Sequence, residues 1–213
     1  MTPADITCVF VDIGGVILTD GWGHGFRSLA ATKFQINLQD LERRHDQAWP
    51  THELGLITMD EYLDLVVFYC SRPFTKAAFT AFIYEQSQAD QEMLDLIRSI
   101  KLTYGLKVFV VSNEGRELND FRIRTFRLNT LVDTFISSCY VHLRKPDAKM
   151  LLLALDVSQV PVNNIVFIDN TAMHIQVAKG LGIRGILHTD QRSTAHQLAL
   201  LGLERVHESG SVG

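Results

Sequence analysis

Short apolar runs alternate along most of the chain with longer segments in which apolar residues recur every three or four positions. The short runs are rich in β-branched and aromatic residues and are apolar at consecutive positions, which is typical of strands buried on both faces of a parallel sheet. The longer segments have the period of amphipathic helices. This alternation predicts an α/β fold with a doubly wound, Rossmann-like parallel-sheet core. The predicted strands are 6–11, 106–111, 134–137, 165–168 and 185–187, and the predicted core helices are 91–101, 116–126, 148–155 and 172–181.

The segment between residues 21 and 90 has a different pattern. Amphipathic periods recur through it without a convincing strand, so we expect an all-helical cap inserted after strand one. Gly21, Gly23 and Gly25 at its start form either a flexible entry or a plain turn. The predicted domains are a core of 1–20 and 91–208, a cap of 21–90 and a tail of 209–213, with cap helices at 26–34, 38–49, 59–69 and 76–85.

Composition excludes several classes of protein. The chain has 213 residues, with 20 Lys and Arg against 24 Asp and Glu, a net charge of −4 that disfavours a nucleic-acid partner. No apolar run approaches the roughly 20 residues of a membrane span, and the N-terminus lacks a signal-peptide pattern. Cys8, Cys70 and Cys139 lie in apolar runs without C-x-x-C spacing, which favours buried, reduced thiols. We therefore expect a cytoplasmic protein with no membrane or nucleic-acid partner.

Polar residues end three of the predicted strands. Asp12 follows the first, Ser112 and Asn113 end the second, and Asp169 and Asn170 follow the fourth. A single Asp at a strand end is more often a turn former or a helix cap. Because the carboxyl ends of parallel strands meet over one crevice, three such groups together predict a site.

The residues around Asp12 suggest nucleophilic chemistry. Gly14 and its neighbour leave backbone N–H groups open beside the carboxylate, which suits an anion. A carboxylate can attack an electrophile to form a covalent intermediate that water then hydrolyses. Lys145, in the segment RKPD, either supplies positive charge to this site or is a solvated lysine at a helix start. Asp12, the Gly14 carbonyl, Asp169 and Asn170 offer the hard oxygen ligands that Mg²⁺ prefers.

Four segments, in order, resemble the motifs of the haloacid dehalogenase-like (HAD) hydrolases: FVDIGGVI, VFVVSN, RKPD and VFIDN. The resemblance implies that Asp12 is the nucleophile, that the Ser112 hydroxyl and the Asn113 backbone bind phosphoryl oxygens, and that Lys145 stabilises the nucleophile and the transferred group. It also implies metal ligands at positions 169 and 170. The helical insert resembles the all-α (C1) cap, and its HELG segment is similar to the glucose-1-phosphatase and epoxide-hydrolase N-domain branch. The function implied is a Mg²⁺-dependent phosphatase that hydrolyses a small, sugar-phosphate-like metabolite through an aspartyl-phosphate on Asp12.

Two positions depart from the family pattern. Gly14 replaces the second Asp that serves as the acid/base in related phosphatases, and Asn170 replaces an acidic metal ligand. Acid–base help is typically worth about 10²–10⁴-fold, so we expect slow turnover or a good leaving group. His24 and His52 in the cap are candidates for the missing acid, or are histidines of the cap surface. His45 and His52 have no Cys or His partners at zinc-site spacing, so we expect surface histidines there.

Two further interpretations stay open. In a metal-free 2-haloacid dehalogenase the same Asp displaces halide, and those relatives also lack the second Asp. The departures also fit a catalytically weak or inactive family member that acts as a binding module. Cap residues Trp22, Trp49, Arg43 and Arg44 either line the site, or belong to the cap core and a solvated helix face.

Overall fold

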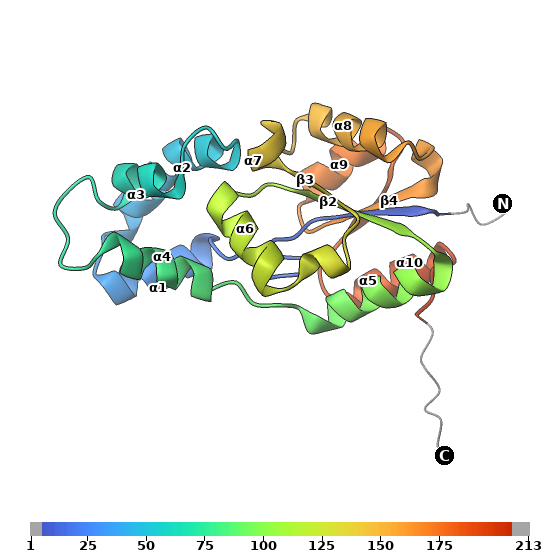
Figure 1. Ribbon diagram of the computed structural model, residues 1–213, viewed down its shortest axis with the longest axis horizontal. Coiled ribbons are helices and arrows are strands. Elements are labelled where there is room, and N and C mark those ends of the chain that lie inside the picture. Colours follow the sequence, from blue (N-terminus) through green and yellow to red (C-terminus); the bar gives the residue numbers. More distant parts are fainter. Residues whose placement is uncertain (1–5, 206–213) are drawn as a thin grey trace, which may run out of the picture.

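A computed structural model describes residues 6–205, which form a five-stranded parallel sheet with helices on both faces and a helical cap at one end (Figure 1). The strand order is β3-β2-β1-β4-β5. Each predicted strand is confirmed to within two residues, as is the doubly wound parallel core; the predicted tail, 209–213, lies outside the described residues. The strands are β1 (Cys8–Val11), β2 (Lys107–Ser112), β3 (Thr134–Ser137), β4 (Ile165–Asp169) and β5 (Arg184–Leu187).

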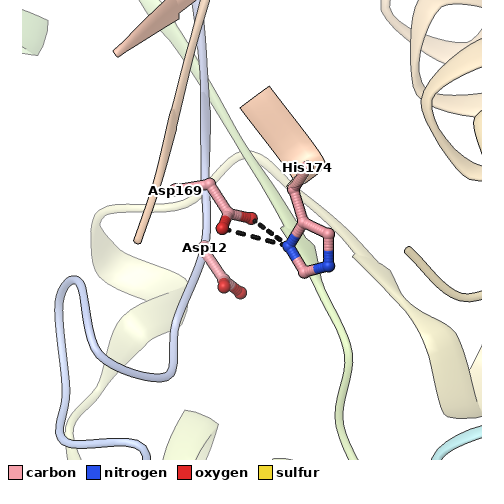
Figure 2. A group of neighbouring side chains, drawn as sticks. All are labelled: Asp12, Asp169 and His174. Atoms are coloured by element: carbon pink, nitrogen blue, oxygen red, sulfur yellow. Dashed lines mark hydrogen bonds and ion pairs between the residues drawn. The ribbon is translucent and has the colours of Figure 1, made fainter. Parts of the chain in front are cut away.

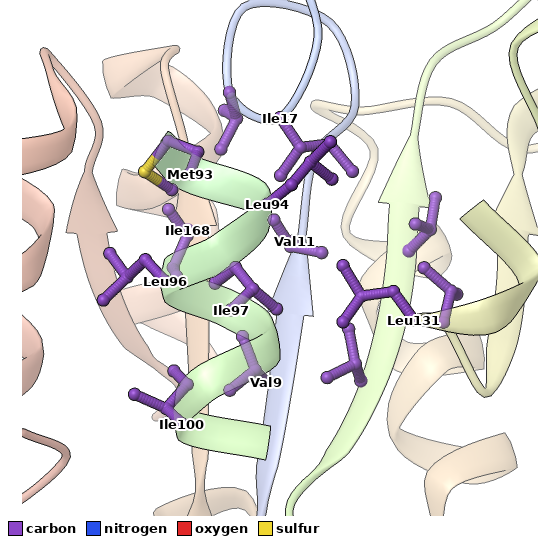
Figure 3. Packing of buried hydrophobic residues seen from close by; sticks show 14 of the residues in the cluster. Val9, Val11, Ile17, Met93, Leu94, Leu96, Ile97, Ile100, Leu131 and Ile168 are labelled. Atoms are coloured by element: carbon purple, nitrogen blue, oxygen red, sulfur yellow. The ribbon is translucent and has the colours of Figure 1, made fainter. Parts of the chain in front are cut away.

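Helices cover both faces of the sheet, which explains the continuous apolar runs. On β1, Val9 and Val11 pack with one set of helices (Figure 3), whereas Phe10 packs with the other. The first set is α5 (Gln91–Tyr104), α6 (Arg116–Thr125) and α10 (Gln191–Leu200), and the second is α8 (Ala148–Ser158) and α9 (Ala172–Gly180). The sequence pattern did not predict α10 or the short α7 (Ser138–Val141). Among residues 6–205, no helix combines the length and apolar content needed to cross a membrane.

The cap has an apolar core of its own. Its aromatic residues Trp22, Tyr62 and Phe79 are buried together, and Leu118 of α6 enters the same cluster from the core. The all-helical cap after β1 is therefore present, although the boundaries at residues 20 and 91 stay a prediction. The cap helices are α1 (His24–Phe34), α2 (Leu38–Glu53), α3 (Met59–Val66) and α4 (Lys76–Glu85).

The two segments that join cap and core run side by side. The Thr19 amide donates to the Gln88 carbonyl at 2.9 Å, and its hydroxyl donates to the Gln86 carbonyl at 2.6 Å. Two residues nearer the core on each segment, the Asp90 amide donates to the Ile17 carbonyl at 3.0 Å. Chain entry and exit therefore meet at one place.

Arg122 of α6 fastens both segments. Its guanidinium donates to the carbonyl oxygens of Thr19 and Asp20, at 3.2 and 2.8 Å, and to the Ser87 hydroxyl at 3.1 Å. Gly21 has a φ of +71°, and a Cβ at this position would overlap the Arg122 guanidinium. The glycine-containing entry to the cap is thus a packed turn at Gly21.

Two expectations about burial are wrong. Cys8 and Cys139 are buried and free, but Cys70 is exposed, because α3 ends at Val66 and the apolar stripe of the predicted longer helix stops with it. His45 and His52 are buried. His45 lies in the buried stripe of α2 together with Leu41 and Ala48. His52 extends this stripe, since α2 continues past the predicted end at 49. Their rings pack on aromatic neighbours of the cap, His45 on Trp49 and His52 on Tyr62.

Candidate active site

A cavity of about 370 Å³ lies where the carboxyl ends of the strands face the cap. The structure brings most of the predicted site residues to this cavity: Asp12, Gly14, Asn113, Lys145 and Asn170 line it, whereas Ser112 and Asp169 are fully buried beneath it. Side chains that sequence reasoning did not select also line it. These include Asp20, Arg27, Glu53, Glu114, Arg122, Arg144 and His174.

Lys145 lies between two carboxylates. Its Nζ is 3.0 Å from Asp12 Oδ2 and 2.6 Å from Asp169 Oδ2, and all three side chains are buried. The interpretation of Lys145 as a solvated helix-start lysine is therefore wrong. Burial opposes the charge on Lys145, but Asp12 and Asp169 outweigh it and raise the pKa of the amine.

The two carboxyl groups differ in their surroundings. Burial raises the pKa of Asp12, and the positive charge of Lys145 opposes this. Burial also acts on Asp169, but His174 and Lys145 together outweigh it and lower the pKa of that carboxyl. The Asp12 Oδ1 accepts the Ile13 amide at 2.9 Å, so Oδ2 is the oxygen that faces Lys145. These surroundings therefore favour the charged form of Asp169 and disfavour that of Asp12.

Asn113 fixes the backbone of Lys145. Its Nδ2 donates to the Lys145 carbonyl at 2.9 Å, and its Oδ1 accepts the Lys145 amide at 2.8 Å. The Lys145–Pro146 peptide bond is cis. Sequence reasoning gave a role only to the Asn113 backbone, and no local signal could pair side chains from residues so far apart in the chain.

Ser112 faces a second buried ion pair. Its hydroxyl donates to Glu114 Oε1 at 3.3 Å, and the same oxygen accepts Arg122 Nη1 at 2.6 Å. The Ser112 hydroxyl also lowers the pKa of Asp12, so it lies within reach of that carboxylate. Ser112 thus connects Asp12 to Glu114 and, through Arg122, to the joint between cap and core.

Asn170 lies over the loop that follows Asp12. Gly15 has a φ of +74°, and a Cβ at this position would overlap the Asn170 side-chain amide. Only glycine accommodates both this backbone conformation and this close approach. The structure therefore brings the amide of Asn170 beside the turn that contains Gly14.

His174 completes the group around Asp169, as Figure 2 shows. Its Nδ1 is 3.0 Å from both carboxylate oxygens of Asp169. Asp12, Asp169 and His174 each offer one potential metal ligand, and these atoms lie within 4.8 Å of one another. Sequence reasoning missed His174; the available signal was a histidine in the first turn of the helix that follows the Asp169-Asn170 pair.

The cap contributes the carboxyl group of Glu53 to the cavity. Glu53, at the end of α2, pairs with Arg144 of the core at 2.5 Å between Oε2 and Nη2. Burial raises the pKa of the Glu53 carboxyl, and Arg144 opposes this. The backbone here also docks on the core, since the Ser138 hydroxyl donates to the Glu53 carbonyl at 2.6 Å and His142 Nδ1 lies 2.7 Å from the Leu54 carbonyl oxygen.

The other cap candidates divide between the cavity and the surface. Trp22 and Trp49 both line the cavity and pack in the cap core. Neither histidine proposed as the missing acid belongs to the cavity lining: His24 pairs with Glu42 at the surface, and His52 is packed against Gly115. The two arginines, Arg43 and Arg44, pair with Asp40 on α2.

Comparison with known proteins identifies the family. A family model described as "haloacid dehalogenase-like hydrolase" matches residues 6–182. Drimenol cyclase drtB of Aspergillus calidoustus is 26% identical over 159 residues, which cover 72% of this chain and 30% of that protein. This chain therefore spans less than a third of the length of that curated relative.

Solved structures share the fold at low identity. A HAD family enzyme from Bacteroides thetaiotaomicron, in a magnesium complex, has a TM-score of 0.74 and 20% identity, covering 86% of this chain and 93% of that one. The L-2-haloacid dehalogenase of Xanthobacter autotrophicus, with chloropropionic acid covalently bound, has a TM-score of 0.62 and 14% identity, covering 98% and 84%. The family match includes the loops that carry Asp12, Lys145 and Asp169, and the chain belongs to the haloacid dehalogenase-like hydrolases.

Proposed function

We propose that this hydrolase is a Mg²⁺-dependent phosphatase that acts on a small phosphorylated metabolite, with Asp12 as the nucleophile. The observation that carries this proposal is the convergence of Asp12, Lys145 and Asp169 beside a cavity under the cap. A cavity of about 370 Å³ suits a small molecule. The magnesium complex of the Bacteroides enzyme supports the metal by analogy.

The chemistry of the donor set fits Mg²⁺. Asp12, the Gly14 carbonyl, Asp169 and the amide oxygen of Asn170 would hold it, since hard oxygen ligands are those that Mg²⁺ prefers. In the present structure the Asn170 Nδ2 faces Gly15 and its Oδ1 accepts the Thr171 hydroxyl at 3.3 Å, so the amide would turn to present its oxygen to the metal. When bound, the metal supplies positive charge that stabilises the phosphoryl oxygens during transfer.

The residues of the chain account for both chemical steps. A carboxylate oxygen of Asp12 attacks phosphorus, the bond from phosphorus to the leaving oxygen breaks, and that oxygen takes up a proton. Water then attacks the aspartyl-phosphate at phosphorus, releasing inorganic phosphate and the free carboxylate. Lys145 Nζ, 3.0 Å from Asp12, stabilises the negative charge of the transferred group in both steps.

Glu53 is the best source of the proton that Gly14 cannot supply. It lines the cavity from the cap, where the leaving group would lie, and burial raises the pKa of its carboxyl, which favours the protonated form. Arg144 Nη2, 2.5 Å from Glu53 Oε2, orients the side chain. We assign Glu53 the role of general acid in the first step.

One observation favours a second function, that of a metal-free 2-haloacid dehalogenase. Lys145 and His174 together contact both carboxylate oxygens of Asp169, so protein groups alone can balance its charge. In that reaction Asp12 attacks the carbon that bears the halogen, halide leaves, and water hydrolyses the resulting ester. The covalent chloropropionate in the Xanthobacter enzyme is a precedent within the same fold.

One set of assays separates these functions. Phosphate release from an aryl phosphate and halide release from a 2-chloro acid are measured with Mg²⁺ and with EDTA, for the wild type and for Asp12→Asn. Phosphate release that needs Mg²⁺ and is lost in Asp12→Asn supports the phosphatase, whereas halide release that persists in EDTA supports the dehalogenase. Silence toward both substrates and a panel of phosphorylated metabolites would indicate a binding module.

A further inference from the structure

His174 is the residue of this site that neither the sequence motifs nor the proposed reaction uses. It lies in the first turn of α9 and lines the cavity, and its side chain is only 14% exposed. Its Nδ1 faces the Asp169 carboxylate symmetrically, at 3.0 Å from each oxygen (Figure 2). The ring is therefore oriented by Asp169, with a nitrogen directed at the same carboxylates that would hold a cation.

The side chains around His174 carry excess negative charge that a bound cation would neutralise. Two carboxylates, Asp12 and Asp169, share the single ammonium of Lys145. The next cation, Arg122, is already paired with Glu114 at 2.6 Å. Within residues 6–205, Asp12, Asp169 and His174 form the one group of three such side chains whose ligand atoms are close enough to share a metal ion.

The types of donor distinguish among metals. Mg²⁺ favours oxygen ligands, and Mn²⁺ accepts the same ligands, whereas imidazole nitrogen suits Zn²⁺, Fe²⁺ and Ni²⁺. Asn170 offers a neutral amide beside the Gly14 turn, which contributes less to binding a hard cation than a carboxylate does. Both residues shift the site in the same direction, away from Mg²⁺.

We propose that His174 is a nitrogen ligand of the divalent cation, and that the site prefers an ion suited to imidazole, such as Zn²⁺, to Mg²⁺. This inference rests on the metal-dependent phosphatase proposed above and replaces Mg²⁺ as its preferred ion. Asp12, Asp169 and His174 would hold the cation together, and the nitrogen now 3.0 Å from Asp169 would serve as one of its ligands. The ring must then carry its proton on Nε2, which leaves the Nδ1 lone pair for the metal.

Pulsed electron paramagnetic resonance of the full chain loaded with Mn²⁺ tests this ligand directly. We expect a nitrogen modulation that changes when the histidines are labelled with ¹⁵N, and that is lost in His174→Asn. The matched control is His196→Asn, an exposed histidine on α10, which should keep the signal. Competition between Zn²⁺ and Mg²⁺ should show that His174→Asn weakens Zn²⁺ binding by about tenfold or more while changing Mg²⁺ binding less.

Two results would overturn the proposal, and they differ in what else they affect. Mn²⁺ bound with oxygen coupling alone in the wild type would mean that His174 only orients Asp169, and a metal-dependent phosphatase would still stand. Failure of Zn²⁺, Mn²⁺ and Mg²⁺ alike to bind would remove the metal-dependent function together with the His174 ligand.

Discussion

Two fully buried cations lie at the same cavity, and their surroundings differ. Arg122 donates to Glu114, to Ser87 and to two backbone carbonyl oxygens, so its charge and its hydrogen-bonding capacity are largely satisfied. Lys145 contacts two carboxylates, Asp12 and Asp169. The first arrangement is electrically balanced by one partner, whereas the second leaves excess negative charge.

The difference indicates how a buried charge serves structure in one place and chemistry in another. A balanced pair whose donors are largely used has little to gain from a ligand, and Arg122 accordingly fastens the joint between cap and core. An unbalanced group attracts a further cation or an electrophile, and the Lys145 group contains Asp12, the nucleophile that we propose. Substitutions of Arg122 and Lys145 test this distinction, and those of Glu53 and His45 test buried groups outside it.

The largest effect is expected at Arg122. Arg122→Met leaves the Glu114 carboxylate buried without its partner, so the free energy of unfolding should fall by about 3–5 kcal/mol in a urea titration. The double variant with Glu114→Gln should recover part of this loss, because no uncompensated charge remains. Arg124→Met, an exposed position on the same helix, is the control. A loss no larger than that of the control would contradict the structural role.

Substitution of Lys145 should act mainly on turnover. Lys145→Met removes the cation that stabilises the transferred group, and kcat for an aryl phosphate should fall by about 10²–10³-fold. Lys149→Met, an exposed lysine of α8, should leave kcat unchanged. If Lys145→Met retained more than a tenth of the wild-type rate, Lys145 would be another structural cation like Arg122.

The proposed role of Glu53 as general acid is tested by comparing substrates with good and poor leaving groups. Glu53→Gln should lower kcat for an alkyl phosphate by about 10²-fold, since a poor leaving group needs a proton, and should affect an aryl phosphate little. The ratio of the two rates is the measurement, because a change in cap docking would lower both. Equal losses for the two substrates would show that Glu53 positions Arg144 instead.

The smallest effect concerns His45, a buried residue of the cap that does not line the cavity. Burial lowers the pKa of His45 to about 3, so the folded chain keeps this ring neutral while the unfolded chain gains a proton below about pH 6.5. The His45 contribution to stability is thus intact above pH 6.5 and falls as the pH drops from 6.5 toward 3, by about 2 kcal/mol at pH 5. His45→Gln should flatten the dependence of unfolding free energy on pH over this range, and the exposed His196→Gln should not; an unchanged slope in His45→Gln would contradict the assignment.

The sequence was sufficient for the strands and for the residues at their ends, because burial on both faces of the sheet gives a continuous apolar run that stops at the site. Asp12, Asn113, Asp169 and Asn170 could be selected for this reason. The same local logic explains the error at Cys70, where a helical period continued in the sequence beyond the actual end of α3 at Val66.

Residues that lie far apart in the sequence but contact one another in the fold could not be identified from local patterns. Arg122 reads as one of several charged positions on an amphipathic helix, and only the fold shows that it is buried against both cap joints. Glu53 and Arg144 come from the cap and the core, and their pairing depends on how α2 docks near α7. His174 had a local signal, but its use required the position of Asp169 in space.

The hydrogen bond between Thr19 and Gln88 joins the two segments through which the chain enters and leaves the cap, so the cap can be exchanged as one unit. Because these two residues are already hydrogen-bonded, a short loop could bridge them without disturbing the sheet. Loss of the cap would expose Leu118 and Phe121 on α6, so a minimal core would need polar residues at those two positions. A different cap joined at Thr19 and Gln88 would change the residues that contact the substrate and leave Asp12 in place. Recombination of caps is therefore a route to altered substrate selectivity.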